Sequence, residues 1–183
     1  VAEAVVSATC APLPPSIAAM VWLQWWTGAR PGEICAMTTG EIDTSGELWE
    51  YRPLRHKTAH LERDRVIVLG PRAQEILRPF LRRTLHEPIF TPLMAHEERL
   101  ERRRSEYAPP PGSYDYREAP SYLRRRREAP EPKRFRTMWT ATAYARAISG
   151  AAKAAEQPHW SPNQLRHAAS TRIRRAAGLD AAQ

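Results

Sequence analysis

The stretch SIAAMVWLQWWTGA, residues 16–29, decides the fold. Its residues are apolar on nearly every side of a helix with 3.6 residues per turn, with Gln24 as a polar residue in the middle. A helix that is apolar all round is buried on all sides rather than along one stripe. We therefore expect residues 16–29 to form the core helix, with Ser16 as its N-terminal cap and Gly28 relaxing its C-terminal end.

The rest of the chain predicts further helices around one small sheet. Prolines at first helical positions and glycines or prolines after last turns mark the helix ends, and alternating apolar and polar residues mark two strands joined as a hairpin. The expected helices are residues 1–10, 31–37, 70–84 with a kink at Pro79, 141–157 and 161–178, and the expected strands are 48–58 and 63–70. This pattern predicts an α+β fold, mainly helical, with a small antiparallel sheet at its edge.

Residues 96–136 differ from their flanks in composition. They hold twelve Lys or Arg against eight Asp or Glu, six prolines and few aliphatic residues. Such a segment cannot bury enough apolar surface to offset the entropy lost on ordering. We expect a basic, Pro/Arg-rich, disordered or partly helical insertion within a single domain of residues 1–183. Its arginine runs would either contact DNA phosphates or stay solvated.

The overall charge indicates a polyanionic partner. Lys and Arg exceed Asp and Glu by 28 − 20, a net charge of +8, which favours nucleic acid. Cys10 and Cys35 lie among apolar residues, which is typical of reduced, buried thiols. The longest apolar run, residues 17–26, is far shorter than the ~20 residues that span a bilayer, and no secretory signal is visible. We expect a cytoplasmic protein with no membrane partner.

Three cationic residues stand at the ends of expected elements. Arg30 follows the core helix, Lys57 lies in the hairpin and Arg166 lies on the last helix. If the fold brings them together, they would bind a phosphate, because Arg offers a planar fork of donors and Lys a mobile charge with a transferable proton. Each also has a plainer interpretation: Arg30 pairs with Glu33, Lys57 is a turn lysine, and Arg166 is a surface arginine like Arg172. Spacing alone favours the plainer interpretation.

The sequence motifs around these three residues favour the phosphate-binding interpretation instead. In chain order they are TGARPGEI (27–34), HKT (56–58), RDRVIVLGPRAQEIL (63–77) and PNQLRHAAST (162–171). In this order and spacing they closely resemble the catalytic domain of the tyrosine recombinases, the phage integrase family. The resemblance covers residues 1–95 and 137–183. It implies site-specific DNA recombination or integration, in which DNA strands are cut and rejoined through a 3′-phosphotyrosine intermediate.

The resemblance also implies a role for each matching residue. Arg30 and Arg166 match the two catalytic arginines, which are expected to bind the non-bridging oxygens of the scissile phosphate and stabilise the charge that builds there. Lys57 matches the general acid that protonates the leaving 5′ oxygen. Glu33 matches the acidic residue expected to orient Arg30 or the nearby backbone. The resemblance implies no metal and no other cofactor.

Two positions near Arg166 need separate treatment. Asn163 stands where the family pattern His-x-x-Arg has its histidine, and an asparagine donates hydrogen bonds but does not exchange a proton near neutral pH. His167 fits the family's Leu-Arg-His pattern. We expect His167 either to support the active site or to be a hydrogen-bonded core histidine.

The family's nucleophilic tyrosine has no counterpart in this sequence. It lies several helical turns beyond the second arginine, and residues 167–183 contain no tyrosine. We expect a fragment, truncated at both ends, that binds double-stranded DNA weakly and cleaves none alone. Its full-length parent would act as a tetramer on DNA, in the cytoplasm and at the bacterial nucleoid.

Other classes of protein fit part of the pattern. A non-catalytic DNA-binding module from a decayed recombinase would keep the basic cleft without the chemistry. In an RNA-binding basic protein, residues 96–136 would be the functional part and would fold on their target. A type IB topoisomerase shares the chemistry, but the motifs quoted above are closer to those of integrases.

Overall fold

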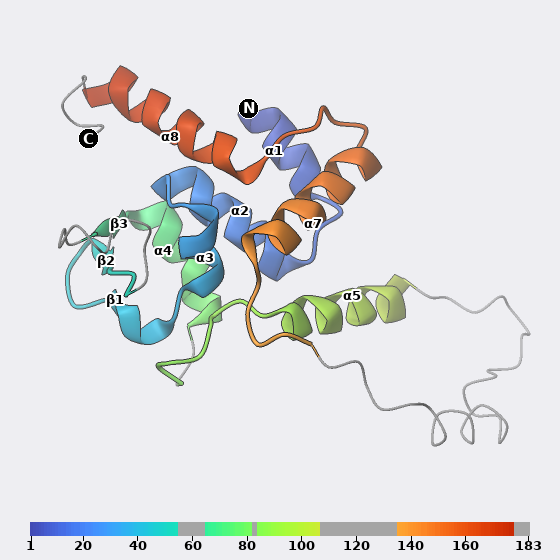
Figure 1. Ribbon diagram of the computed structural model, residues 1–183, viewed down its shortest axis with the longest axis horizontal. Helices are drawn as coiled ribbons and strands as arrows, with labels where there is room; N and C mark the ends of the chain where they lie inside the picture. The colour runs from blue at the N-terminus through green and yellow to red at the C-terminus, as the bar shows by residue number, and fades with distance from the viewer. Residues whose placement is uncertain (55–64, 82–83, 107–134, 178–183) are drawn as a thin grey trace, which may run out of the picture.

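The computed structural model describes residues 1–54, 65–81, 84–106 and 135–177 (Figure 1). In chain order its elements are α1 (Glu3–Cys10), α2 (Pro15–Thr27), α3 (Pro31–Ala36), the 3-10 turn η1 (Thr39–Glu41), β1 (Ile42–Asp43), β2 (Trp49–Tyr51), β3 (Ile67–Leu69), α4 (Pro71–Leu77), the 3-10 turn η3 (Arg78–Phe80), α5 (Pro92–Glu106), α7 (Ala141–Ala154) and α8 (Pro162–Ala177). The predicted mainly helical α+β fold with one small antiparallel sheet is confirmed. None of the described helices is both long and apolar enough to cross a membrane.

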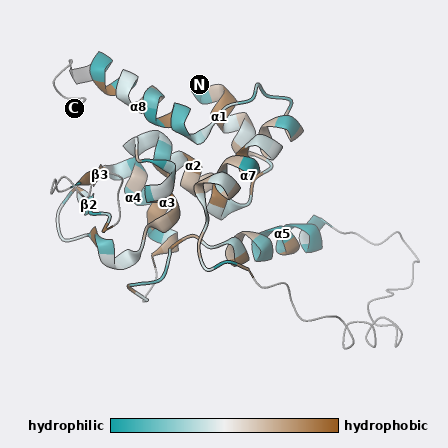
Figure 2. Cartoon of the chain, in the orientation of Figure 1, coloured by the Kyte–Doolittle hydropathy of each residue, from teal (hydrophilic) through white to brown (hydrophobic). Residues whose placement is uncertain are grey.

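Helix α2 is the core of the molecule, as its sequence predicted. Helices α1, α3, α4, α5 and α8 all pack against it. Ile17, Met20 and Leu23 have no exposed surface. Even Gln24 is fully buried, and its side chain donates to the carbonyl of Ala29 at 3.0 Å. The hydrophilic residues gather instead on the outer parts of α5 and α8, at the two ends of the molecule (Figure 2).

The two ends of α2 form in different ways. Gly28 ends the helix in the left-handed region at φ 65°, as predicted, and its N–H donates to Gln24. The expectation that Ser16 is the cap is wrong, because the helix already begins at Pro15. Ser16 lies inside the first turn, where its N–H and its Oγ both donate to the carboxylate of Glu98 on α5, at 2.6–3.1 Å. An acidic side chain from a distant helix therefore satisfies the positive N-terminal end of α2.

Two glycine replacements should change stability in opposite directions. Gly28→Ala places a Cβ 3.1 Å from the Cβ of Ala169 on α8, in a left-handed conformation that costs a side chain about 1–2 kcal/mol. Gly150→Ala, inside α7, meets nothing within 4 Å and should add up to about 1 kcal/mol, because alanine is the better helix former. Urea unfolding of both variants measures the effects. A loss of stability in both, or in neither, would contradict this account.

The sheet has the strand order β1-β2-β3, with both pairs antiparallel. Its strands β2 and β3 confirm the predicted hairpin, although they are shorter than expected. Side chains alternate across the sheet: Tyr51 and Leu69 point into the core with no exposed surface, whereas Val68 is 52% exposed. Strand β1 was not predicted, because two residues are too short to show an alternating pattern. The hairpin loop, residues 55–64, lies outside the described residues.

The helix predicted at residues 70–84 is shorter than expected. It ends at Leu77 and tightens into the 3-10 turn Arg78–Phe80 around Pro79, and Leu81 is already extended at ψ 130°. Proline lacks the N–H that an α-helix would use at this point. The other predicted helices agree with the observed ones to within a few residues.

Residues 96–106 follow the partly helical alternative for the insertion rather than the disordered one. They form most of α5, and Glu98 binds Ser16 while Nη2 of Arg102 donates to the carbonyl of Pro12 at 3.0 Å. Charged side chains therefore help to dock this part of α5 on the start of α2. Residues 107–134, which make up most of the expected insertion, lie outside the described residues.

Candidate functional site

The position of Arg30 is set by the turn between α2 and α3. Arg30 is the residue before α3, and Pro31 occupies the first helical position, where its missing N–H is tolerated. The carboxylate of Glu33, one turn later, accepts from the backbone N–H of Arg30 at 2.7 Å and from its Nη1 at 2.9 Å. The sequence Arg-Pro-Gly-Glu therefore fixes both the backbone and the side chain of Arg30.

Arg166 reaches the same place from α8. Leu165 and Ala169, on the face of α8 that packs against the rest of the chain, are 0% and 1% exposed. Nη1 of Arg166 crosses to the end of α2 and donates to the carbonyl of Gly28 at 2.7 Å. The close approach of α8 to Gly28 is possible because this residue has no side chain.

A third arginine, Arg65, completes the group and was not predicted. It lies just before β3, and its Nε and Nη2 donate to the two carboxylate oxygens of Glu33 at 2.6 Å and 3.1 Å. Strand alternation contained the signal for it. Arg65, Ile67 and Leu69 are two residues apart, so all three belong to the inner face of the sheet, where a cation needs a buried partner.

We call Arg30, Arg65, Arg166 and Glu33 the arginine cluster. The side chain of Glu33 is 3% exposed, and burial alone would raise its pKa. The hydrogen bonds from Arg65 and Arg30 outweigh that effect and lower the pKa below its usual value, so the carboxylate is ionised. Three arginines and one carboxylate give the cluster a net charge of 3 − 1 = +2.

The excess of positive charge affects the pKa of Arg166. Its pKa is lowered by burial first, then by the nearby charges of Arg65 and Arg30, while Glu33 raises it. An arginine stays protonated under any condition in which the protein folds, so a bound anion, and not the loss of a proton, would offset the repulsion between these charges. The side chains of Arg30 and Arg65 are 30% and 22% exposed, which leaves the cluster open to a ligand from solvent.

The family model for the phage integrase family matches the chain over residues 1–183. The chain belongs to the phage integrase family. Membership implies site-specific DNA recombination as the general function and DNA as the partner. The chain matches no curated protein and no solved structure.

The fold of this integrase-family chain brings Arg30, Glu33 and Arg166 together, whereas Lys57 lies outside the described residues. Asn163 is exposed on α8, one turn before Arg166 and on the same side of the helix. His167 is exposed as well, so the core-histidine alternative is wrong. One residue of helical rotation moves it off the buried face. The catalytic roles of these residues stay predictions.

A further arginine of the integrase-family chain turns out to be structural. Arg172 was grouped with the surface arginines, but its guanidinium stacks on Trp25 at 3.9 Å from the ring centroid and donates to the Trp25 carbonyl. Burial lowers its pKa. Arg172 therefore fastens α8 to α2, beyond the turn that carries Arg166.

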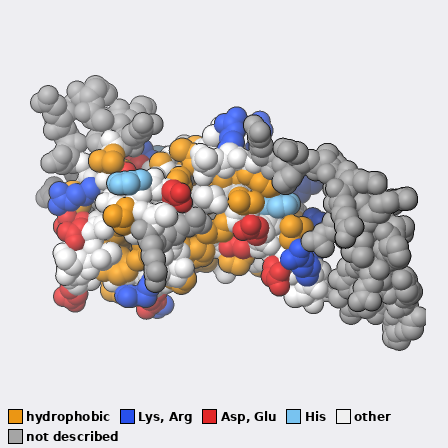
Figure 3. Space-filling view, turned by 90° about the horizontal axis from the view of Figure 1, so that it is seen from below, with side chains coloured by type: hydrophobic (Ala, Val, Ile, Leu, Met, Phe, Trp, Pro, Cys, Tyr) orange, Lys and Arg blue, Asp and Glu red, His pale blue; other side chains and the backbone are white. Residues whose placement is uncertain are grey.

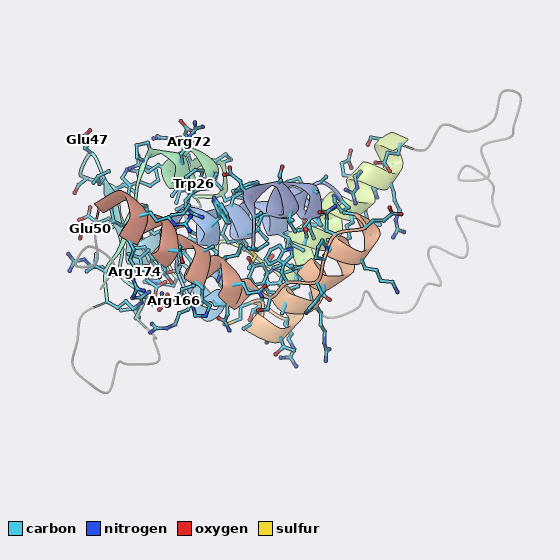
Figure 4. All side chains as sticks on the ribbon, turned by 90° about the horizontal axis from the view of Figure 1, so that it is seen from above. Trp26, Glu47, Glu50, Arg72, Arg166 and Arg174 are labelled. Carbon is cyan, nitrogen blue, oxygen red and sulfur yellow. The ribbon has the colours of Figure 1, made fainter. Side chains whose placement is uncertain are left out.

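A further basic residue lies near Arg166 on α8. Figure 4 shows Arg166 and Arg174 along the same edge of α8. On the face seen from below, basic side chains are interspersed with acidic and apolar ones (Figure 3). Among the described residues, no three His, Cys, Asp or Glu side chains come together in a way that could hold a metal ion.

Proposed function

We propose that the arginine cluster binds a backbone phosphate of double-stranded DNA during the strand cleavage and rejoining of site-specific recombination. The observation that carries this proposal is the convergence of Arg30 and Arg166, from α3 and α8, at the end of the core helix with a net charge of +2. A phosphodiester carries one negative charge and two non-bridging oxygens, so it matches two guanidinium forks. Assembly of the parent protein as a tetramer on two duplexes belongs to the same proposal.

The chemistry of such a site is electrostatic. A tyrosine hydroxyl attacks phosphorus and releases its proton to water, the new P–O bond to tyrosine forms, and the bond from phosphorus to the 5′ oxygen breaks. Arg30 and Arg166 stabilise the charge on the two other oxygens, and one such donor is worth about 3–4 kcal/mol in the transition state. Lys57 gives its proton to the leaving 5′ oxygen. The amide of Asn163 donates a hydrogen bond to the phosphate, and the exposed His167 supports the site from the next position of α8.

The attacking tyrosine is assigned to no residue of this sequence. Residues 167–183 contain none, and Tyr144, the last tyrosine before them, is fully buried with its hydroxyl donating to Gln24 at 3.3 Å. Burial also raises the pKa of Tyr144 well above its usual value, which makes it a poor nucleophile. The proposal for residues 1–183 is therefore phosphate binding and positioning.

Arg30→Ala and Arg166→Ala should each weaken binding to a fluorescein-labelled duplex of about 20 base pairs by about tenfold, because a hydrogen bond to a charged group is worth about 1.5–3 kcal/mol. The slope of log K against log salt should also fall by about 0.9 for each lost phosphate contact. Fluorescence anisotropy across a salt series measures both quantities.

Arg72→Ala is the matched control, since it removes the same charge from a side chain that is 74% exposed on α4. It should leave the affinity within about twofold, as expected for a solvated surface charge. Equal affinities for Arg72→Ala, Arg30→Ala and Arg166→Ala would contradict the proposal. They are also the result expected of an RNA-binding protein whose basic segment 96–136 does the binding.

A non-catalytic DNA-binding module is the second candidate, because a cluster with a net charge of +2 can hold a phosphate without any nucleophile. Such a module would use the same cluster to hold a phosphate and would never form a bond to it. A covalent adduct between the purified chain and a nicked suicide duplex would exclude this candidate.

A further inference from the structure

The carboxylate of Glu33 receives four hydrogen bonds from described residues, and they are divided unequally. Arg65 supplies two of them through Nε and Nη2, one to each oxygen. The side chain of Arg30 supplies only one, from Nη1 to Oε1, and the backbone N–H of Arg30 supplies the fourth. Arg65 therefore holds Glu33 in the side-on, two-point geometry in which arginine binds a carboxylate most strongly.

This division leaves most of the Arg30 guanidinium available. Its Nε and Nη2 make no hydrogen bond to any described residue, and its side chain is 30% exposed. Arg65, by contrast, uses two of the three nitrogens of its guanidinium group to bind Glu33. The charge of Arg65 also lowers the pKa of Arg166 more than the charge of Arg30 does. The charge of Arg65 therefore lies inside the cluster rather than beside it.

We propose that Arg65 is a positioning residue: by occupying both oxygens of Glu33 it prevents Glu33 from capturing Arg30, and so leaves Arg30 free to bind phosphate. The inference rests on the proposed function in that phosphate is the ligand of Arg30. Without Arg65, the two freed oxygens of Glu33 would draw the Arg30 guanidinium into a two-point pair of its own, since a buried carboxylate must find donors. The net charge of the cluster would also fall from +2 to +1.

Five variants separate this role from a direct contact between Arg65 and the phosphate. Arg65→Gln should weaken binding to the labelled duplex by about tenfold, which is about 1.4 kcal/mol. Glu33→Gln combined with Arg65→Gln should bind within about threefold of Glu33→Gln alone, because the neutral amide no longer competes for Arg30. Arg65→Lys should lose about threefold, since an ammonium keeps the charge but cannot cover both oxygens. The exposed Arg72→Gln is the charge-matched control and should change the affinity less than twofold.

Restoration of binding in the double variant is the decisive result. If Arg65 were merely structural, Arg65→Gln would lower the melting temperature, and adding Glu33→Gln would not restore the affinity. Arg65→Gln binding as tightly as the unchanged protein would overturn the inference. A double variant as weak as Arg65→Gln would overturn it too, since Arg65 would then touch the phosphate itself. If Arg65→Gln does not fold, Arg65→Lys with and without Glu33→Gln gives the same comparison.

A measurement without DNA keeps this inference distinct from the proposed function. The Nε–H resonance of Arg30, followed by nitrogen-15 NMR in the free chain, should exchange rapidly with water in the unchanged protein. In Arg65→Gln the exchange should slow, because Glu33 then binds Nε, and it should be rapid again in the double variant. Failure of the unchanged chain to bind duplex would sink the proposed function, whereas unchanged Arg30 exchange in Arg65→Gln would sink the inference about Arg65.

Discussion

Glu33→Ala should lower the free energy of unfolding by about 3 kcal/mol, because removing one partner of a buried ion pair leaves its partners uncompensated. Glu33 is 3% exposed and is the only carboxylate hydrogen-bonded to Arg30 and Arg65 among the described residues. Both arginines keep some exposure, 30% and 22%, so water offsets part of the loss and the lower end of the usual range applies. Urea unfolding at neutral pH measures the change.

The effect of Glu33 should depend on pH in a defined direction. The folded protein lowers the pKa of Glu33 from its ordinary value of 4.5: burial opposes ionisation, and the hydrogen bonds of Arg65 and Arg30 outweigh it. A carboxyl group with a lowered pKa contributes its full stabilisation above the unfolded value and loses it as the pH falls through the folded value. The stability difference between the unchanged protein and Glu33→Ala should therefore shrink as the pH falls below the ordinary pKa of a glutamate side chain.

Glu33→Gln is the control for this prediction. The amide oxygen can still accept from the backbone N–H of Arg30 at the start of α3, so part of the stabilisation should survive. The variant has no carboxyl group at this position to titrate. A stability difference between the unchanged protein and Glu33→Ala that stays constant down to strongly acidic pH would show that the ion pairs contribute nothing.

Trp160→Ala should lower the free energy of unfolding by about 4 kcal/mol, within the range of about 3–5 kcal/mol for buried tryptophan truncations. Trp160 is 3% exposed and stands two residues before α8, where its Nε1 donates to Oγ1 of Thr9 in α1 at 3.1 Å. Truncation leaves a cavity between the two helices and removes the contact that fixes the start of α8. Urea unfolding followed by circular dichroism measures the loss.

Trp160→Phe separates packing from hydrogen bonding at this site. The ring still fills most of the volume, and Oγ1 of Thr9 keeps its own bond to the carbonyl of Val5 at 2.8 Å. We expect a loss of about 1–2 kcal/mol, from the missing donor and the smaller ring. If Trp160→Ala costs less than Trp160→Phe, the cavity account of Trp160 is wrong.

Features that depend on neighbouring residues could be predicted without the structure. The core helix, its end at Gly28 and the start of α3 at Pro31 all follow from local backbone chemistry. The pairing of Arg30 with Glu33, one helical turn later, is local in the same sense. The motifs around these residues also identified the family correctly, because three segments in the right order carry more information than any one of them.

Features that depend on residues far apart in the chain could not be predicted without the structure. Glu98 satisfies the N-terminal end of α2 from 82 residues away, so the sequence pointed to Ser16 as the cap and left residues 96–106 as disordered or partly helical. In the same way, Arg65 looked like an ordinary strand residue until the sheet placed it against Glu33, 32 residues earlier in the chain. Charged side chains have no periodic pattern that names their partner, whereas apolar side chains do.

By itself, the sequence determined the core helix, the class of fold, the family and the two arginines at the element ends, because each of these is encoded by residues close together in the chain. Only the tertiary structure decided that Arg30 and Arg65 share one buried carboxylate, that Arg166 lies near enough to feel their charges, and that Arg172 is a structural contact rather than a free cation. The physical reason is that the energy of a buried charge depends on every donor within a few ångströms, and folding alone brings those donors together.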